Sequence, residues 1–566
     1  MKNQTGSRLL RSAVSTVMAT TLGMSAGMPA YAQDTVDTSA ITAQDLLKLL
    51  IDEGVIDQGK VKALTEKLKN RQRATAGAAV ESTSLQSKDI KPAGEAGVVR
   101  VPYVPKYIKD EIRDQVRIGL KEDVSRDVMA QAKLERWGLP GALPEWVGRV
   151  KFSGDMRVRE ESVFFAPGNV QGDYLDMNYI NSKGRWVSPD PREILNTTED
   201  RNRLRARFRL GMKAKVNDRF DVGARLVTGN SGDPVSTNQT QGTYAQKWQS
   251  SFDLAYLRYT SFEKQLIANA GRIENPFFGS DLVWDSDLTF EGVAASYWWM
   301  RSSGIMDEFR SFDPFVTFGV FPIGEVERSS EDKWLYAAQT GFQYEFSSQS
   351  RLTAALAYYS YDNIVGERNP VQDGTDFDYT APAFMQKGNT LFDIRNTATT
   401  TAPLPALFAL ASDYDLANLY VEYDIANFAP IHVIVAADYA KNLGFDQGEV
   451  AARVGEEIDE RVEGYQARVT IGWPQVTKAR DWQASLIYRY LERDAVLDAF
   501  TDSDFHGGGT DADGYILKFD YGLYDNVWVT LRWLSSNEVD GDSYPMTLGS
   551  GKLGIDTLQV DLNAKF

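Results

Sequence analysis

A ladder of basic side chains at every second residue is the strongest chemical signal in the sequence. Its members are Arg203, Arg205, Arg207, Arg209, Lys213 and Lys215. The intervening residues are apolar, namely Leu204, Ala206, Phe208, Leu210, Met212, Ala214 and Val216. A period of two is typical of a β-strand, which would carry the basic side chains on one face and the apolar ones on the other. Because a row of fixed cations concentrates anions, its chemistry would be electrostatic selection.

The two faces of such a strand need different surroundings. A Lys or Arg turned toward lipid at the bilayer midplane costs roughly 2–4 kcal/mol. Neighbouring cations about 7 Å apart repel by roughly 0.6 kcal/mol in water and about four times more at an effective dielectric near 20. The basic face therefore requires water, whereas the apolar face fits lipid or a protein core. For this stretch alone, a soluble antiparallel sheet with one solvated face is an equally good interpretation.

Composition excludes several classes of function. The chain has 566 residues and a formal net charge of −17, which argues against nucleic acid as a partner. It has no cysteine, so disulfides and thiol chemistry are excluded. His432 and His506 are the two histidines, which disfavours a histidine-built metal or acid–base centre. We expect no catalytic residue, metal or cofactor.

The N-terminal region predicts export. Residues 1–32 have a basic start, a short apolar middle and an Ala30-Tyr31-Ala32 ending, as in a signal peptide cleaved after Ala32. Residues 33–80 predict a helical hairpin, 81–104 a linker, and 105–146 an amphipathic helix with a Pro/Trp-rich junction. This small α-helical region is expected to be periplasmic. No later stretch approaches about 18 uninterrupted apolar residues, so the exported chain could enter a membrane only as a barrel.

Residues 147–566 predict an all-β transmembrane barrel of about 16 antiparallel strands. Segments of period two recur along this region at about the ten-residue length that a tilted membrane strand requires. We expect strands near 147–160, 202–216, 218–228, 250–260, 264–273, 290–300, 313–322, 332–346, 350–361, 413–425, 430–441, 463–473, 481–491, 513–522, 525–534 and 556–566. The facing of 250–260 is ambiguous. Short turns alternate with long polar connections, with 301–312 the poorest fit, and a soluble sandwich has no reason to segregate its loops this way.

Several motifs resemble those of a known family. They are Gly154-Asp-Met-Arg-Val-Arg159, the ladder itself, Gly271-Arg-Ile-Glu-Asn-Pro-Phe-Phe278, Leu282-Val-Trp-Asp285 and Glu291-Gly-Val293. Over roughly residues 101–566 the chain resembles the putative porin family of Gram-negative outer membranes. The resemblance implies contact with outer-membrane lipid and lipopolysaccharide, and no catalytic residues. Phe566 is similar to the C-terminal aromatic signal read by the barrel-assembly machinery, and a homotrimer is expected by analogy with similar barrels.

The predicted function is passive diffusion of small hydrophilic solutes through a water-filled pore. The predicted pore-lining residues are Arg203, Arg205, Arg207, Arg209, Lys213, Lys215, Asp155, Arg157, Arg159 and Arg225. Either this basic wall favours anions, or lumen carboxylates such as Asp155 compensate it and leave a weakly selective pore. A different class of function is an envelope tether or interaction protein, in which the barrel serves as the membrane anchor.

Three long loops carry further expectations. The loop at 362–412 either folds into the lumen as a constriction or lies on the surface, and its candidate constriction residues are Asp373, Asp376, Asp378, Tyr379 and Arg395. The acidic loops at 442–462 and 492–512 are expected to be solvated. The second, with Asp502 and Asp513, partly resembles a calcium-binding loop, but His506 and Asp513 replace preferred ligands.

Overall fold

The computed structural model describes most of the predicted barrel. It covers residues 147–183, 191–300, 312–327, 329–346, 349–370, 374–395, 406–541 and 552–566. The predicted signal peptide, helical hairpin, linker and amphipathic helix lie outside the described residues, as does Asp373. Within the described part of the chain, no helix is long and apolar enough to cross a membrane.

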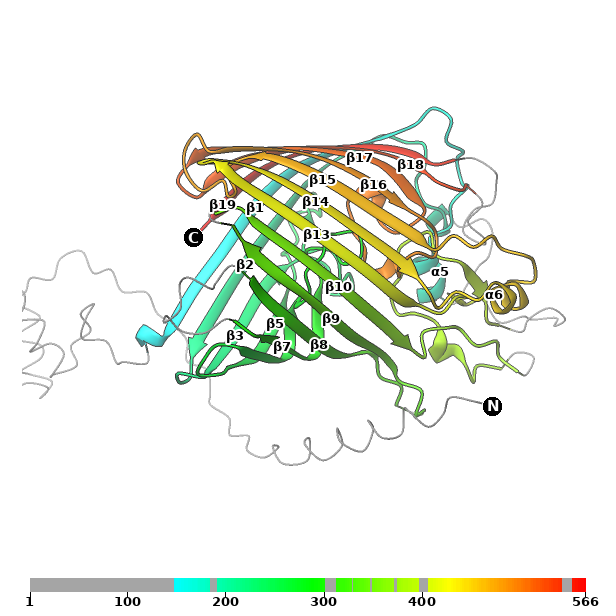
Figure 1. The fold of residues 1–566 in the computed structure, drawn as a ribbon. Helices are drawn as coiled ribbons and strands as arrows, with labels where there is room; N and C mark the ends of the chain where they lie inside the picture. Colours follow the sequence, from blue (N-terminus) through cyan, green and yellow to red (C-terminus); the bar gives the residue numbers. More distant parts are fainter. Residues whose placement is uncertain are drawn as a thin grey trace, which may run out of the picture. The chain divides into compact units, whose positions relative to one another are not determined.

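Sixteen long strands among the described residues form one closed antiparallel sheet (Figure 1). Their bounds are β1(Val150–Phe165), β2(Arg201–Lys215), β3(Phe220–Thr228), β5(Ser250–Thr260), β6(Leu266–Glu274), β7(Thr289–Trp298), β8(Phe312–Gly324), β9(Lys333–Glu345), β10(Arg351–Asp362), β13(Asp415–Phe428), β14(Ile431–Asn442), β15(Glu463–Gly472), β16(Trp482–Leu491), β17(Ala512–Tyr524), β18(Val527–Glu538) and β19(Gly554–Lys565). Each strand pairs with the next one in this order, and β19 pairs with β1. The predicted barrel and its strand number are therefore confirmed.

The strands alternate as a membrane barrel requires. Leu204, Val293, Phe318 and Leu356 are 52%, 53%, 59% and 56% exposed, respectively, on the outside of the sheet. Large apolar side chains at the outward-facing positions of most other strands are also exposed. An apolar surface that encircles the barrel would be costly in water, so it is the surface that lipid covers.

A β-bulge explains why the facing of 250–260 was ambiguous. Arg225 pairs with Leu254 and Leu226 pairs with Phe252, so Asp253 is left without a partner in the register of β3 and β5. Phe252 and Leu257 consequently both point outward, although their positions differ by an odd number and a regular strand would place them on opposite faces. The extra residue places the carboxylate of Asp253 against Arg225 inside the barrel.

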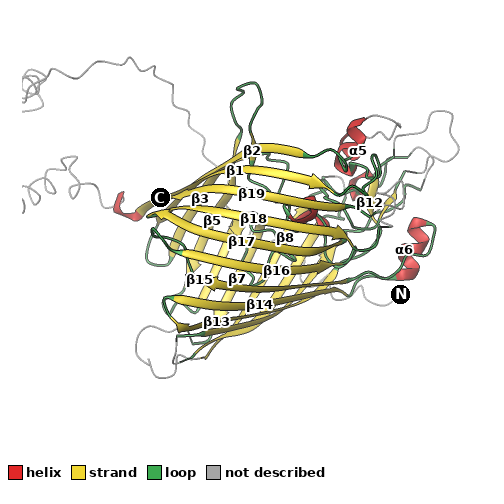
Figure 2. Cartoon of the chain, turned by 90° about the horizontal axis from the view of Figure 1, so that it is seen from above, coloured by secondary structure: helices red, strands yellow, loops and turns green. Residues whose placement is uncertain are grey.

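The two ends of the barrel differ. Short turns and the C-terminus lie at one end, hereafter the turn end, and the long connections with α5(Met177–Lys183) and α6(Gln447–Val454) gather at the other, the loop end (Figure 2). The long connections also hold β4(Gln239–Thr240), β11(Leu391–Asp393), β12(Phe408–Leu410) and the 3-10 turns η2(Pro191–Glu193), η4(Asp378–Thr380), η5(Asp498–Phe500) and η6(Phe505–Gly507), whereas η1(Val147–Arg149) precedes β1. Asp446 caps α6 by accepting from the N–H of Glu449, and Gly455 ends it in the left-handed conformation.

The interior is divided into an apolar side and a polar side. Phe321, Leu335 and Tyr359 of β8, β9 and β10 point inward and pack with Leu282 and Trp284, which come from the connection between β6 and β7. The basic ladder lies on β2, away from these strands in the order of the sheet. The lumen is thus partly filled by folded protein on one side, whereas its other side is built of charged groups.

Candidate functional site

The basic ladder occupies the inner face of β2. Its residues alternate with Leu204 and Met212, which are exposed on the outside of the sheet. Arg203 and Arg205 lie toward the loop end, because β2 begins after a long connection, and Lys213 and Lys215 lie toward the turn end. The strand thus sets the spacing of the cations, and the inner face of a closed barrel excludes lipid from them.

The half of the ladder nearer the turn end is compensated. Asp155 on β1 pairs with Arg207 at 3.1 Å and with Arg209 at 2.8 Å. Asp287 contacts the same two arginines, each at 3.4 Å. Two guanidinium groups therefore meet two carboxylates. The two lysines also have carboxylate neighbours, Asp221 for Lys213 and Asp218 for Lys215.

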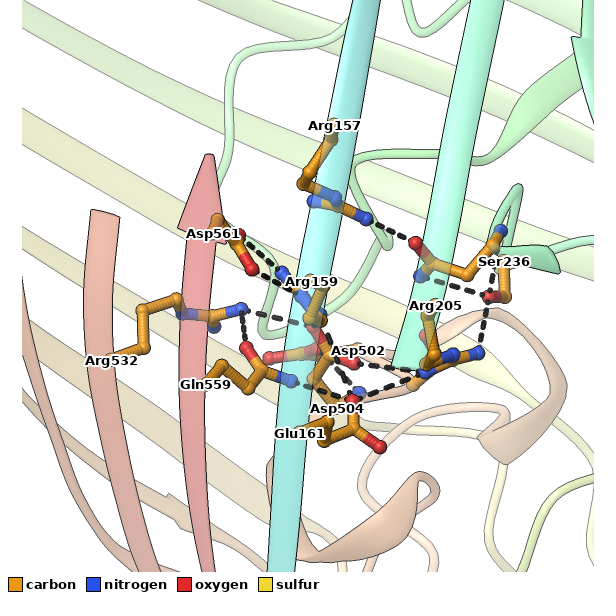
Figure 3. A network of polar contacts seen from close by, with 12 residues as sticks. Arg157, Arg159, Glu161, Arg205, Ser236, Asp502, Asp504, Arg532, Gln559 and Asp561 are labelled. Atoms are coloured by element: carbon orange, nitrogen blue, oxygen red, sulfur yellow. Dashed lines mark hydrogen bonds and ion pairs between the residues drawn. The ribbon is translucent and has the colours of Figure 1, made fainter. Parts of the chain in front are cut away.

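The half of the ladder nearer the loop end shares its carboxylates among more arginines (Figure 3). Glu161 pairs with both Arg203 and Arg205 and lies 3.9 Å from Arg159. Arg159 also binds Asp561 of β19 through two hydrogen bonds of 2.7 and 2.9 Å. Because Arg159 is only 1% exposed, its charge depends on these partners.

Asp504 completes this network from a different part of the chain. Its carboxylate lies 2.8 Å from Arg159, 3.0 Å from Arg532 of β18 and 4.0 Å from Arg205. Burial would raise the pKa of Asp504, but Arg159 and Arg532 lower it well below its usual range. The connection between β16 and β17, residues 492–511, is thereby tied to the walls of β1, β2 and β18.

The remaining predicted pore-lining arginines have separate partners. Arg157 donates to the side-chain oxygen of Asn238 at 2.5 Å, and no carboxylate contacts it within the described ion pairs. Arg225 pairs with Asp253 at 2.6 Å and lies 3.9 Å from Glu274. The structure therefore brings Arg157, Arg159 and Asp155 together with the ladder, and it gives Arg225 its own carboxylates one strand further on.

The connection between β6 and β7, residues 275–288, folds inward across the barrel. Ser280 donates its N–H and its hydroxyl to Asp438 of β14, at 2.8 and 2.7 Å. Asp281 pairs with Arg489 of β16 at 2.8 Å, and Asp287 reaches the ladder. Burial alone would raise the pKa of Asp281, but the neighbouring charge of Arg489 lowers it below its usual range. This loop spans from the ladder to the opposite wall.

Sequence reasoning missed this inward loop, although a signal was present. Residues 275–288 contain Phe277, Leu282, Val283 and Trp284, all of which are buried. Such a density of large apolar side chains is unsuited to an exposed connection, and it indicates a segment with its own packing partners.

The prediction of a solvated loop at 492–512 is wrong. Asp494, Asp498 and Asp502 are 0%, 1% and 6% exposed, whereas Glu449 and Glu456 in the other acidic loop are exposed. Asp502 pairs with Arg489 at 3.1 Å, so its carboxylate binds a guanidinium group rather than a calcium ion. Within the described residues, no group of three or more His, Cys, Asp or Glu side chains is arranged to hold a metal ion.

The loop between β10 and β13 interlocks with residues 492–511. Lys387 donates to the carbonyl oxygens of His506 and Gly508 at 2.5 and 2.8 Å. Asn389 donates to the carbonyls of Arg493 and Val496, at 2.7 and 2.9 Å. Burial lowers the pKa of Lys387 to about 7. The two loops thus form one buried unit at the loop end.

The candidate constriction residues form a local cluster in the same long loop. Asp378 pairs with Arg395 and accepts from Asn369 at 3.0 Å, and Tyr379 packs against Phe377. Asp376 is exposed. The contacts described for these residues lie within their own loop, whereas the connections at 229–249, 275–288 and 492–511 contact the ladder.

Phe566 lies at the seam of the barrel. Its N–H donates to the carbonyl of Gly154 on β1, and its carbonyl accepts from the N–H of Gly154, each at 2.9 Å. A Cβ at position 154 would lie 2.5 Å from the ring of Phe566 and 2.7 Å from the carbonyl oxygen of Arg209. Position 154 therefore requires glycine, because the backbone of Phe566 pairs with it and the ring of Phe566 leaves no room for a side chain.

The comparison with family models matches most of this chain. A model described as "Putative porin" matches residues 40–566, which include the whole described barrel. No curated protein matches the chain. The family match thus covers the strands, the ladder and both inward loops.

Solved structures of outer-membrane channels are also similar to the chain. The outer membrane channel DcaP of Acinetobacter baumannii is 13% identical over 74% of this chain and 97% of that chain, with a TM-score of 0.36. A high-pH structure of Pseudomonas putida OprB is 11% identical over 76% and 97%, with a TM-score of 0.40. OmpF of Salmonella typhi, in complex with daunomycin, is 12% identical over 74% and 97%, with a TM-score of 0.35.

Proposed function

Because the chain belongs to the Putative porin family, we propose that this outer-membrane, porin-like channel lets small hydrophilic solutes diffuse passively and favours anions. The anion preference is supported mainly by the different ratios of arginines to carboxylates at the two ends of the ladder. Asp155 and Asp287 balance Arg207 and Arg209, whereas toward the loop end the arginines outnumber the carboxylates. A solute that passes the ladder therefore meets an excess of positive charge.

The selectivity follows from electrostatics rather than from chemistry on the solute. Fixed cations in a narrow hydrated passage raise the local anion concentration, because low-dielectric walls focus their field. The carboxylates that pair with them reduce this field without cancelling it. The loops at 275–288 and 492–511 narrow the passage at the depth of the arginines, so a permeating ion passes within the range of their charge.

Reversing one charge of the ladder tests the proposal. Arg209→Glu replaces a cation that already neighbours Asp155 and Asp287, so it should leave an uncompensated negative cluster. We expect the reversal potential of the refolded protein under a salt gradient to move toward cation selectivity. The matched control is Arg219→Glu, the same change at an exposed residue of the turn between β2 and β3.

Two results would count against the anion preference. The first is a reversal potential that Arg209→Glu leaves where it was. The second is an equal shift in both variants, because that would reflect the net charge of the whole protein rather than the field at the ladder.

A further inference from the structure

A small cavity opens at the loop end of the barrel, beside the basic ladder. It has a volume of about 250 Å³ and lies among β1, β2, β19, residues 195–197, the connection at 492–511 and the loop between β10 and β13. At about 30 Å³ per molecule this corresponds to roughly eight waters, which is enough for a small organic solute. None of the roles proposed above requires such a cavity.

The lining of the cavity is divided into two chemically different sides. The basic side carries Arg201 and Arg203 from the first residues of β2 and Lys387 from the loop between β10 and β13. The apolar side carries Leu195, Leu553 and Ile555, and the last two are 4% and 7% exposed. These two side chains belong to a small apolar cluster with Tyr174, which holds them in place. A ligand that satisfies both sides must be both charged and apolar.

The charged side chains that line the cavity are more basic than acidic. Arg201, Arg203 and Lys387 lie beside two carboxylates, Glu161 and Asp504. Both carboxylates are already paired with arginines, Asp504 with Arg159 and Arg532 and Glu161 with Arg203 and Arg205. Arg201 is exposed and has no carboxylate partner among the described ion pairs. Its guanidinium is therefore available to an external anion.

We propose that this cavity binds one small organic anion with a compact apolar body. The anionic group would accept hydrogen bonds from Arg201 and Arg203, whose planar guanidinium groups suit a carboxylate. The apolar body would pack against Leu195, Leu553 and Ile555. This inference rests on the proposed function, because a site at the loop end would concentrate such solutes where they enter the channel.

Isothermal titration calorimetry on the refolded full-length protein tests the proposal, with benzoate as the probe. Acetate shares the carboxylate but lacks the apolar body, and benzyl alcohol shares the ring but lacks the charge. We expect saturable benzoate binding at one site per chain. Both comparison compounds should bind at least about tenfold more weakly, because benzyl alcohol loses the charged hydrogen-bonded contact and acetate loses the apolar contact. Equal affinity for acetate and benzoate would overturn the two-sided site.

Two substitutions on opposite sides of the cavity locate the binding. Arg201→Gln removes the available guanidinium while leaving the described ion pairs intact, and Leu195→Ser removes apolar contact from the other side. Each should weaken benzoate binding by about tenfold. Arg219→Gln carries the same charge change as Arg201→Gln at an exposed turn and should leave the affinity unchanged. Unchanged affinity in both cavity variants would overturn the proposal.

Conductance recorded on the same preparations separates this inference from the proposed function. A conducting protein that does not bind benzoate would refute the site and leave the channel in place. A protein that binds benzoate but shows no conductance would refute the diffusion channel while the binding site stands.

Discussion

At the scale of single residues, pairing decides what each arginine contributes. Arg159 is almost completely buried and is neutralised by Asp504 and Asp561, so its role is to hold the 492–511 loop and β19 against β1. Arg201 is exposed and has no such partner among the described residues. Two arginines on neighbouring strands therefore differ in role, because the free energy of a buried ion is set by its partners.

The sequence could predict the ladder but not its partners. Alternation from Arg203 to Lys215 is a local pattern, and it correctly indicates which face is basic. Asp287 and Asp504 reach the ladder from loops far away in the chain, and neither lies in a pattern that points to it. The hypothesis of a compensating carboxylate held for Asp155, which is directly opposite Arg209 in the register of β1 and β2.

Asp504→Asn should destabilise the barrel. The substitution removes the negative charge that Arg159 and Arg532 share, and it leaves two largely buried guanidinium groups with fewer partners. Loss of one member of a buried ion pair costs about 3 kcal/mol in unfolding free energy. Urea unfolding of the refolded protein, followed by tryptophan fluorescence, measures this loss.

A neutral substitution at an exposed aspartate provides the control. Asp525→Asn lies in the turn between β17 and β18 and should change the unfolding free energy by less than about 0.5 kcal/mol. If Asp504→Asn were as mild as this control, Asp504 would not be the link between its loop and the wall.

At the scale of elements, strands were predictable and loops were not. Each predicted strand overlaps an observed one, because an amphipathic strand repeats one simple pattern along its length. The first strand was predicted too short, since β1 continues to Phe165. The loops at 275–288 and 492–511 fold by contacts with distant partners, which composition alone does not reveal.

The interlocked loops at the loop end should respond to pH through Lys387. Burial lowers its pKa to about 7, whereas an unfolded lysine has a pKa near 10.4. Between these values the unfolded chain binds a proton that the folded chain lacks, so stability rises with pH. From pH 7 to pH 9 the gain from this group should be about 2 kcal/mol.

The comparison of two methionine variants isolates this effect from other titrating groups. Lys387→Met keeps a long apolar side chain but removes the ammonium, so its unfolding free energy should gain about 2 kcal/mol less than the unsubstituted protein between pH 7 and pH 9. Lys478→Met, at an exposed turn, should follow the unsubstituted protein. A parallel pH dependence in all three proteins would mean that Lys387 is charged in the folded state throughout this range.

At the scale of the whole molecule, the closure of the sheet and the filling of its lumen depend on different parts of the sequence. The sheet closes where β19 pairs with β1 and the backbone of Phe566 pairs with Gly154. The strand number and the alternating loop lengths predicted this closed wall. The sequence did not predict that the interior would be apolar beside Phe321 and Tyr359 and charged beside the ladder, because that division depends on which loops fold inward. The proposed function requires a passage between these two sides.

Conductance of the refolded full-length protein in a planar bilayer, recorded under a salt gradient, tests the central claim most directly. A diffusion channel with a partly compensated basic wall predicts stable conductance steps and a reversal potential shifted modestly toward anion selectivity. A correctly folded barrel that inserts without conductance steps would contradict the account, because the inward loops would then close the lumen rather than narrow it.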